Sequence, residues 1–190
     1  MAMNWVADEA ALLPQAFDEA KDAQSSATNI YVPSIKLGTA AQFHDAGSTE
    51  YGSALFKYVR YTGGASAIPG VAGKAVYYKS ADDNYLVTMD VSTANSAAGI
   101  LHATCGGVLN DDDYVWIQLT GIAAFTDLVN IYNDATTVAF DRLVTPVTAV
   151  TSAEDGQLEQ RLAAAAATVL RRPVAEVMSA NAFLYLDFPR

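Results

Sequence analysis

The sequence predicts a mainly β protein, with a β-barrel or β-sandwich body, an N-terminal helical arm and a C-terminal α-helix. Three observations carry this prediction. Short runs rich in Tyr, Val and Ile recur across residues 30–124, separated by Gly, Asp, Asn and Ser. Alanine and leucine instead recur near helical spacing in residues 1–24 and 158–170. Apolar residues make up 52% of the 190 residues and charged residues only 17%, which excludes a disordered chain.

The chain is expected to divide into three segments. These are the helical arm, residues 1–29, the β-rich body, residues 30–150, and a C-terminal helix with an apolar tail, residues 151–190. In the arm, Pro14 lacks a backbone donor and is expected to kink or divide the helix. A chain of 190 residues is long enough for one domain whose core needs no disulfide or metal to stabilise it.

Several short runs in the body are strand candidates. They are residues 30–32, 35–37, 51–61, 75–78, 85–89, 98–104 and 114–120. A Ser-Ala-Asp-Asp-Asn turn separates 75–78 from 85–89, so these two runs are predicted to form a hairpin. Gly- and Asp-rich sequence connects 98–104 to 114–120, which predicts a second pair. Large side chains occupy both faces of 114–120, so this strand is covered on both sides or uses one face as a contact.

The C-terminal segment carries the clearest helix pattern. Ser152 and Asp155 have the separation of an approximate capping box, and Pro173 stops the helix or opens a second short one. The apolar positions of one helix face are Leu158, Leu162, Ala165 and Val169. The final apolar run, residues 183–188, is interpreted as a strand or an apolar anchor.

Charge and composition exclude several classes of partner. Eleven Lys and Arg against 21 Asp and Glu give a net charge of −10, so we expect no nucleic-acid partner. No run approaches the roughly 18 uncharged apolar residues of a membrane helix, and the N-terminus lacks the pattern of a signal peptide. The one cysteine, Cys105, excludes an intrachain disulfide. These features predict a protein made in a cytoplasm, with no membrane partner.

Two polar or glycine-rich clusters have both a chemical and a structural interpretation. Asp111, Asp112 and Asp113 are interpreted as a solvated hairpin tip, and a calcium site is the alternative, although the spacing of an EF-hand loop is absent. Gly63 and Gly64 are interpreted as turn glycines, because no Gly-Lys-Ser/Thr sequence follows them as in a phosphate-binding loop.

His44 beside Asp45 and the single Cys105 are the other candidates for chemistry. Sequence neighbours rarely have the geometry of a base and its orienting carboxylate, and no nucleophile can be assigned to His44. Cys105 is expected to be a small buried side chain at a strand end. We therefore predict no enzyme activity, no catalytic residue, no cofactor and no metal ligand.

Aromatic residues and the apolar chain ends are the candidates for contact surfaces. Ten Tyr, seven Phe and two Trp fall mostly in predicted strands, where core packing is the default and contacts are the alternative. The chain ends either fold back on the body or dock on a neighbouring subunit. The predicted interface residues are Trp5, Leu12, Leu13, Phe17, Tyr31, Trp116, Phe183, Tyr185 and Phe188.

One part of the sequence resembles a known group of proteins. Residues 98–101 form an Ala-Gly-Ile-Leu strand that leads through a Gly/Asp turn into Tyr-Val-Trp-Ile-Gln-Leu-Thr-Gly, residues 114–121. This pattern resembles the closing hairpin of small β-rich structural proteins of tailed bacteriophages. Residues 75–78 and 35–39 also match the way such chains begin.

The resemblance implies a virion component, in particular a capsid decoration (cement) protein that stabilises the head. Such a protein binds the major capsid protein and copies of itself, as a trimer or dimer, on the capsid surface after synthesis in the bacterial host cytoplasm. A tail- or fibre-associated virion protein that binds another tail subunit or a host surface glycan is the alternative.

Overall fold

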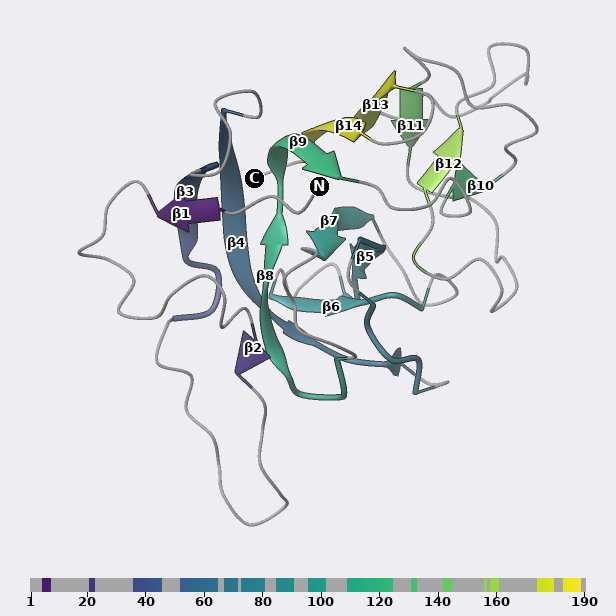
Figure 1. Ribbon diagram of the computed structural model, residues 1–190. Helices are drawn as coiled ribbons and strands as arrows, with labels where there is room; N and C mark the ends of the chain where they lie inside the picture. Colours follow the sequence, from purple (N-terminus) through teal and green to yellow (C-terminus); the bar gives the residue numbers. More distant parts are fainter. Residues whose placement is uncertain are drawn as a thin grey trace.

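The computed structural model shows two β-sheets (Figure 1). It describes residues 5–7, 21–22, 36–45, 52–64, 67–71, 73–80, 85–90, 96–101, 109–124, 131–132, 142–144, 156, 158–160, 174–179 and 183–188. Every named element within these ranges is a strand. They include no helix with the length and hydropathy needed to span a membrane.

The first sheet closes on itself. Its strands are β1 (Trp5–Ala7), β2 (Lys21–Asp22), β3 (Ala40–Asp45), β4 (Ser53–Tyr61), β5 (Ala75–Tyr78), β6 (Leu86–Thr88), β7 (Ala97–Leu101) and β8 (Tyr114–Gln118). The order is β1-β3-β4-β6-β5-β7-β8-β2, and β4 also pairs with β8. That pairing closes β4, β6, β5, β7 and β8 into a five-stranded barrel, in which β4 and β6 are parallel and the other neighbours antiparallel.

The second sheet adjoins the barrel through β9, which is separated from β8 by the single residue Leu119. Its strands are β9 (Thr120–Ala124), β10 (Ile131–Tyr132), β11 (Arg142–Val144), β12 (Leu158–Gln160), β13 (Ala175–Ser179) and β14 (Phe183–Asp187), in the order β10-β12-β11-β13-β14-β9. In Figure 1 this sheet lies at the upper right of the barrel. Leu186 and Phe188 belong to the same buried cluster as barrel residues, so one core serves both sheets.

The two faces of β4 are both buried. Val59 and Tyr61 belong to the core cluster, whereas Phe56 and Tyr58 lie on the opposite face because side chains alternate along a strand. On that opposite face, Trp116 of β8 contacts Tyr58, with ring centroids 5.2 Å apart. The further ring contacts are Phe43–Phe56, Phe43–Trp116 and Tyr58–Tyr114. The five rings form an aromatic layer from β3, β4 and β8.

The predicted mainly β fold with a barrel is confirmed, and so are the two predicted strand pairs. β5 and β6 form an antiparallel pair, and so do β7 and β8. The strand predicted at residues 51–61 is β4, and the final apolar run contains β14. Leu37 is not in a strand; the strand begins instead at Ala40, after a turn in which the Thr39 N–H bonds to the Lys36 carbonyl.

The helix predictions are wrong for the residues that the structure describes. Trp5–Ala7 pairs with β3, Lys21–Asp22 pairs with β8, and Leu158–Gln160 lies between β10 and β11. Strand pairing therefore overrides the helical propensity of these segments. The remaining residues of the predicted arm and of the helix from 151 to 172 lie outside the described part, apart from Gly156.

Candidate interaction surface

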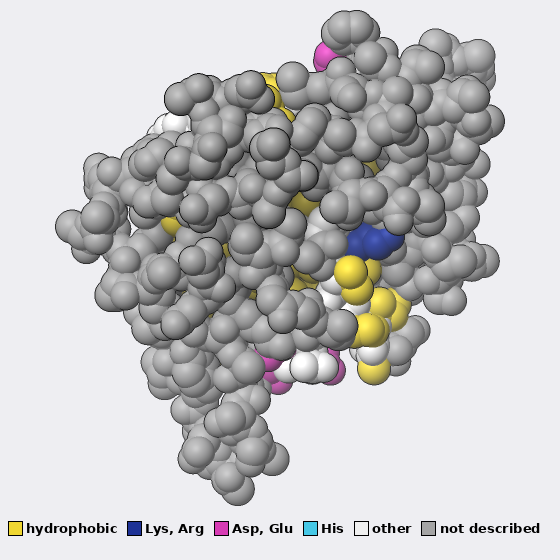
Figure 2. Space-filling model, viewed as in Figure 1, with side chains coloured by type: hydrophobic (Ala, Val, Ile, Leu, Met, Phe, Trp, Pro, Cys, Tyr) yellow, Lys and Arg dark blue, Asp and Glu magenta, His cyan; other side chains and the backbone are white. Residues whose placement is uncertain are grey.

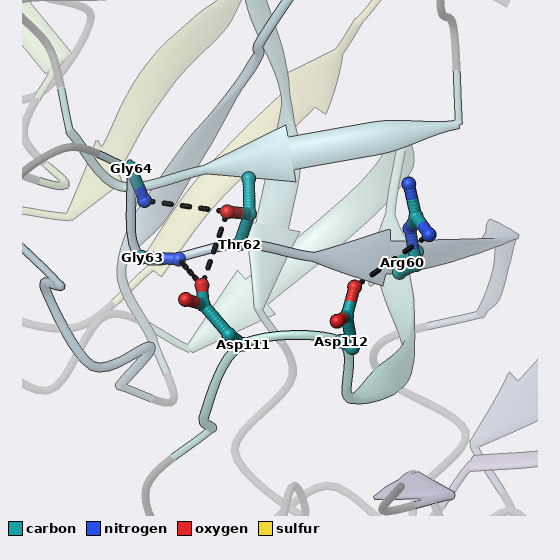
Figure 3. A network of polar contacts seen from close by, with 6 residues as sticks. All are labelled: Arg60, Thr62, Gly63, Gly64, Asp111 and Asp112. Carbon is teal, nitrogen blue, oxygen red and sulfur yellow. Dashed lines mark hydrogen bonds and ion pairs between the residues drawn. The ribbon is translucent and has the colours of Figure 1, made fainter. Parts of the chain in front are cut away.

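A carboxylate before β8 holds the turn that follows β4 (Figure 3). Asp111 accepts hydrogen bonds from the Gly63 backbone N–H and, at 3.0 Å, from the Thr62 hydroxyl. The Thr62 hydroxyl oxygen accepts the Gly64 N–H at 3.4 Å. Hydrogen bonds to an ionised acceptor are stronger than neutral ones. Asp111 therefore fixes the direction in which the chain leaves β4.

The other two aspartates complete the same tip. Asp112 has a φ of 64° and lies 3.5 Å from Arg60 in an ion pair whose side chains are both partly exposed. Asp113 is buried and accepts the Asn110 N–H at 2.7 Å. These contacts agree with a hairpin tip that is solvated at Asp111 and Asp112, but the interpretation is wrong for Asp113, which is buried. Within the described ranges, no group of three His, Cys, Asp or Glu side chains is arranged to hold a metal ion.

The turn after β4 requires glycine. Gly64 has a φ of 70°, and a Cβ there would lie 2.6 Å from the Asp90 carboxylate, so a larger residue is excluded by conformation and by space. The interpretation of Gly64 as a turn glycine is confirmed. The close approach also places the turn after β4 against the buried Asp90, two residues beyond the end of β6.

The segment that follows this turn is apolar and reaches the surface. We call residues 67–71 the apolar loop. Ala67, Pro69 and Val71 are exposed, Val71 by 40%, while Ile68 is half-buried and packs on the core. Figure 2 shows hydrophobic side chains gathered at the surface on one face of the molecule, beside a basic side chain and near acidic ones.

Hydrogen bonds on both sides hold the apolar loop in place. The buried Tyr61 hydroxyl donates to the Ile68 carbonyl at 2.7 Å, and the Ile68 N–H bonds to the Gly63 carbonyl at 2.8 Å. Gly70 exchanges two backbone hydrogen bonds with Leu109, of 2.9 and 2.8 Å. The bonds join the loop to Tyr61 of β4, to the turn after β4 and to Leu109, which precedes β8, so the exposed side chains are carried by a hydrogen-bonded backbone.

Gly70 allows this loop to approach the barrel closely. A Cβ at Gly70 would lie 2.9 Å from Leu109 Cβ and 3.1 Å from the Tyr61 ring. Both neighbours are fully buried, so they have little room to move. The absence of a side chain at position 70 is therefore needed for the loop to pair with Leu109.

Two tyrosines are also exposed, at other places on the surface. Tyr85, immediately before β6, is 45% exposed, and Tyr185 of β14 is 52% exposed. Asp187 is exposed on the same face of β14 as Tyr185, two residues along the strand. Tyrosine is enriched at protein interfaces because it offers a rigid contact area with a polar tip.

The structure separates the interface residues that the sequence predicts. Tyr185 is exposed, whereas Trp116 lies in the aromatic layer and Phe188 in the core. Trp5 lies in β1 and Phe183 in β14, and for these two residues only the position in the strand is described. The predicted residues outside the described part are Leu12, Leu13, Phe17 and Tyr31. His44 lies in β3, and Cys105 is also outside the described part.

The apolar loop was missed by the sequence interpretation. Its signal is the run Ala-Ile-Pro-Gly-Val between two glycine turns, a hydrophobic stretch too short for a strand and interrupted by Pro69. A turn with so many apolar residues indicates a contact surface or a segment that covers the core.

Comparison with known proteins provides no assignment for this chain. No family model matches it, and no curated protein is similar to it in sequence at a significant level.

Proposed function

We propose that this chain is a structural virion protein of a tailed bacteriophage, a capsid decoration protein that binds the major capsid protein lattice and stabilises the head. The proposal rests on the hairpin resemblance of residues 98–121 together with the apolar loop. It assigns the loop, with Val71 at its exposed end, to the contact with the capsid.

The fixed apolar loop is the observation that carries this proposal. Binding costs free energy when a flexible segment must become ordered, and a loop that is already hydrogen-bonded to Tyr61, Gly63 and Leu109 avoids much of this cost. Its exposed groups carry no charge, as is typical of the centre of a protein interface. A decoration protein needs such a rigid, apolar contact on a stable body.

The test is co-sedimentation of the purified full-length protein with undecorated heads of the phage whose genome encodes it. Val71→Asp places a carboxylate in the proposed contact, where desolvation of the charge opposes binding. We expect the apparent affinity to fall at least tenfold. Gln42→Glu adds the same charge at an exposed position of β3 and is expected to bind as the wild type does. Equal binding by both variants and the wild type would refute the role of the loop.

The alternative is a tail- or fibre-associated protein that binds another tail subunit or a host surface glycan. Tyr185 and Asp187 favour it. The exposed Tyr185 ring can stack on a sugar ring, and the Asp187 carboxylate can accept hydrogen bonds from the sugar hydroxyl groups. Immunogold labelling of intact particles separates the two proposals: label over the head supports decoration, and label over the tail supports the alternative.

A further inference from the structure

Lys57 places an ammonium group on the inner side of the barrel. On β4 it shares a face with Val59 and Tyr61, which belong to the core, and it lies opposite Ile117 of β8. Only 8% of the residue is exposed. A lysine at such a position is unusual, because burial removes the water that solvates its charge.

Among the residues that the structure describes, two tyrosine rings lie close to this ammonium. Lys57 Nζ donates a hydrogen bond to the Tyr78 hydroxyl at 3.2 Å and lies 5.1 Å from the centroid of the same ring. It also lies 5.6 Å from the centroid of the Tyr85 ring. Across the described residues, Lys57 takes part in no ion pair. Neutral partners offset only part of the desolvation of a cation, and an anion would offset more.

Lys57 and Tyr78 together present two donors that match one carboxylate. The Tyr78 hydroxyl oxygen accepts the hydrogen bond from the lysine ammonium. Its own O–H therefore points elsewhere and can donate a hydrogen bond to another group. The two donor atoms are 3.2 Å apart and carry a single positive charge. A carboxylate has two oxygens and a single negative charge, whereas a phosphate group is typically bound by more donors.

Tyr85 lies on the solvent-exposed side of the Lys57 ammonium. It is 45% exposed, whereas Tyr78 is only 9% exposed. The Tyr85 ring lies directly on the backbone of Gly38, where an added Cβ would overlap the ring. Gly38 has a φ of 82°, so glycine is favoured there by conformation as well. The Tyr85 ring therefore packs on the backbone of Gly38, and a residue with a side chain at position 38 would displace it.

The geometry points to a carboxylate-binding site formed by Lys57, Tyr78 and Tyr85, where β5 ends and β6 begins. Lys57 and Tyr78 bind the two oxygens, and the exposed Tyr85 ring contacts the carbon skeleton of the ligand. The carboxylate belongs either to a small organic acid or to an acidic side chain of the protein to which this chain binds. The site chemistry does not depend on the function proposed above.

Sodium acetate is the probe for this site. In the full-length protein, we expect acetate to shift the Nζ resonance of Lys57 in a saturable way in lysine-selective NMR, and to raise the melting temperature relative to sodium chloride at equal ionic strength. Lys57→Met is expected to fold and to lose the acetate-specific rise. Lys36→Met removes an exposed lysine near Gly38 and is expected to respond as the wild type does. Tyr78→Phe is expected to weaken binding several-fold.

The proposal is overturned if the wild type shows no saturable shift, or if Lys57→Met retains the full acetate-specific rise. Should Lys57→Met fail to fold, Tyr78→Phe decides the question, because it keeps the charge and removes one donor. Co-sedimentation with heads then distinguishes the two possible sources of the bound carboxylate. Weaker binding by Tyr78→Phe identifies an acidic side chain of the capsid, and unchanged binding identifies a free organic acid. The acetate titration uses no particles, so its failure is distinct from a failure of the decoration proposal.

Discussion

Replacing Asp111 by alanine removes the acceptor that holds the turn after β4. Gly63 is buried, so its N–H would lose its partner without full access to water, which costs about 1.5 kcal/mol. The Thr62 hydroxyl is more accessible and can bind water instead, so its loss adds about 0.5 kcal/mol. We expect Asp111→Ala to lower the free energy of unfolding by about 2 kcal/mol. For a chain of this size, the melting temperature should fall by roughly 4–8 °C.

Urea denaturation followed by tryptophan fluorescence measures this loss, and amide hydrogen exchange locates it. Exchange should accelerate at Gly63, Gly64 and Ile68. Asp112→Asn is the control, because asparagine tolerates the positive φ and only a partly exposed ion pair with Arg60 is lost, worth at most about 0.5 kcal/mol. If Asp111→Ala costs no more than this control, the assignment of Asp111 as the anchor of the turn is wrong.

Two further substitutions test the attachment of the apolar loop. Gly70→Ala should lower the free energy of unfolding by about 1–3 kcal/mol, because its Cβ would collide with Leu109 and Tyr61. Gly52→Ala, where a Cβ would meet nothing within 4 Å but φ is 65°, should cost only about 1 kcal/mol of backbone strain in the same urea assay. Tyr61→Phe removes the hydrogen bond to the Ile68 carbonyl and should cost about 1 kcal/mol, with faster proteolysis at the loop. Unchanged stability and proteolysis in this variant would contradict the account of how the loop is held.

Local sequence signals were sufficient for the hairpins and insufficient for the closure of the barrel. The turn between β5 and β6 is rich in Ser, Asp and Asn, and such residues mark a reversal between two apolar runs. The parallel pairing of Arg60 with Leu86 and the antiparallel pairing of Tyr58 with Trp116 join residues far apart in sequence. Alternation along a strand predicts which side chains share a face, but it does not predict which strand lies alongside.

The helix predictions failed for a related reason. Leu158 has good helical propensity and helical spacing to later residues, but propensity is worth only tenths of a kcal/mol per residue. In the structure Leu158 is fully buried in the core, and Leu158–Gln160 pairs with strands on both sides. The free energy of burial and pairing exceeds the local preference. A prediction made from one segment alone does not include the free energies of burial and strand pairing with other segments.

The polar anchors of the candidate surface could be predicted one by one but not as a unit. The aspartates at 111–113 and the glycines at 63–64 each have the composition of a turn, and each is in a turn. That Asp111 binds Gly63 follows only from the pairing of β4 with β8, which brings the end of one strand beside the start of the other. The same carboxylate holds the turn that precedes the apolar loop.

Closure of the barrel also brings Lys57 together with residues that are not close to it in the sequence. In sequence it interrupts an apolar run, and a long lysine side chain on a strand ordinarily reaches water with its charged end. Closure of the barrel instead brings Tyr78 of β5 and Tyr85 beside its ammonium. Lys57→Met keeps nearly the same volume and removes the desolvation cost, so we expect the ligand-free variant to be at least as stable as the wild type. Packing alone therefore does not account for a lysine at this position, and the acetate response of the wild type tests whether an anion does.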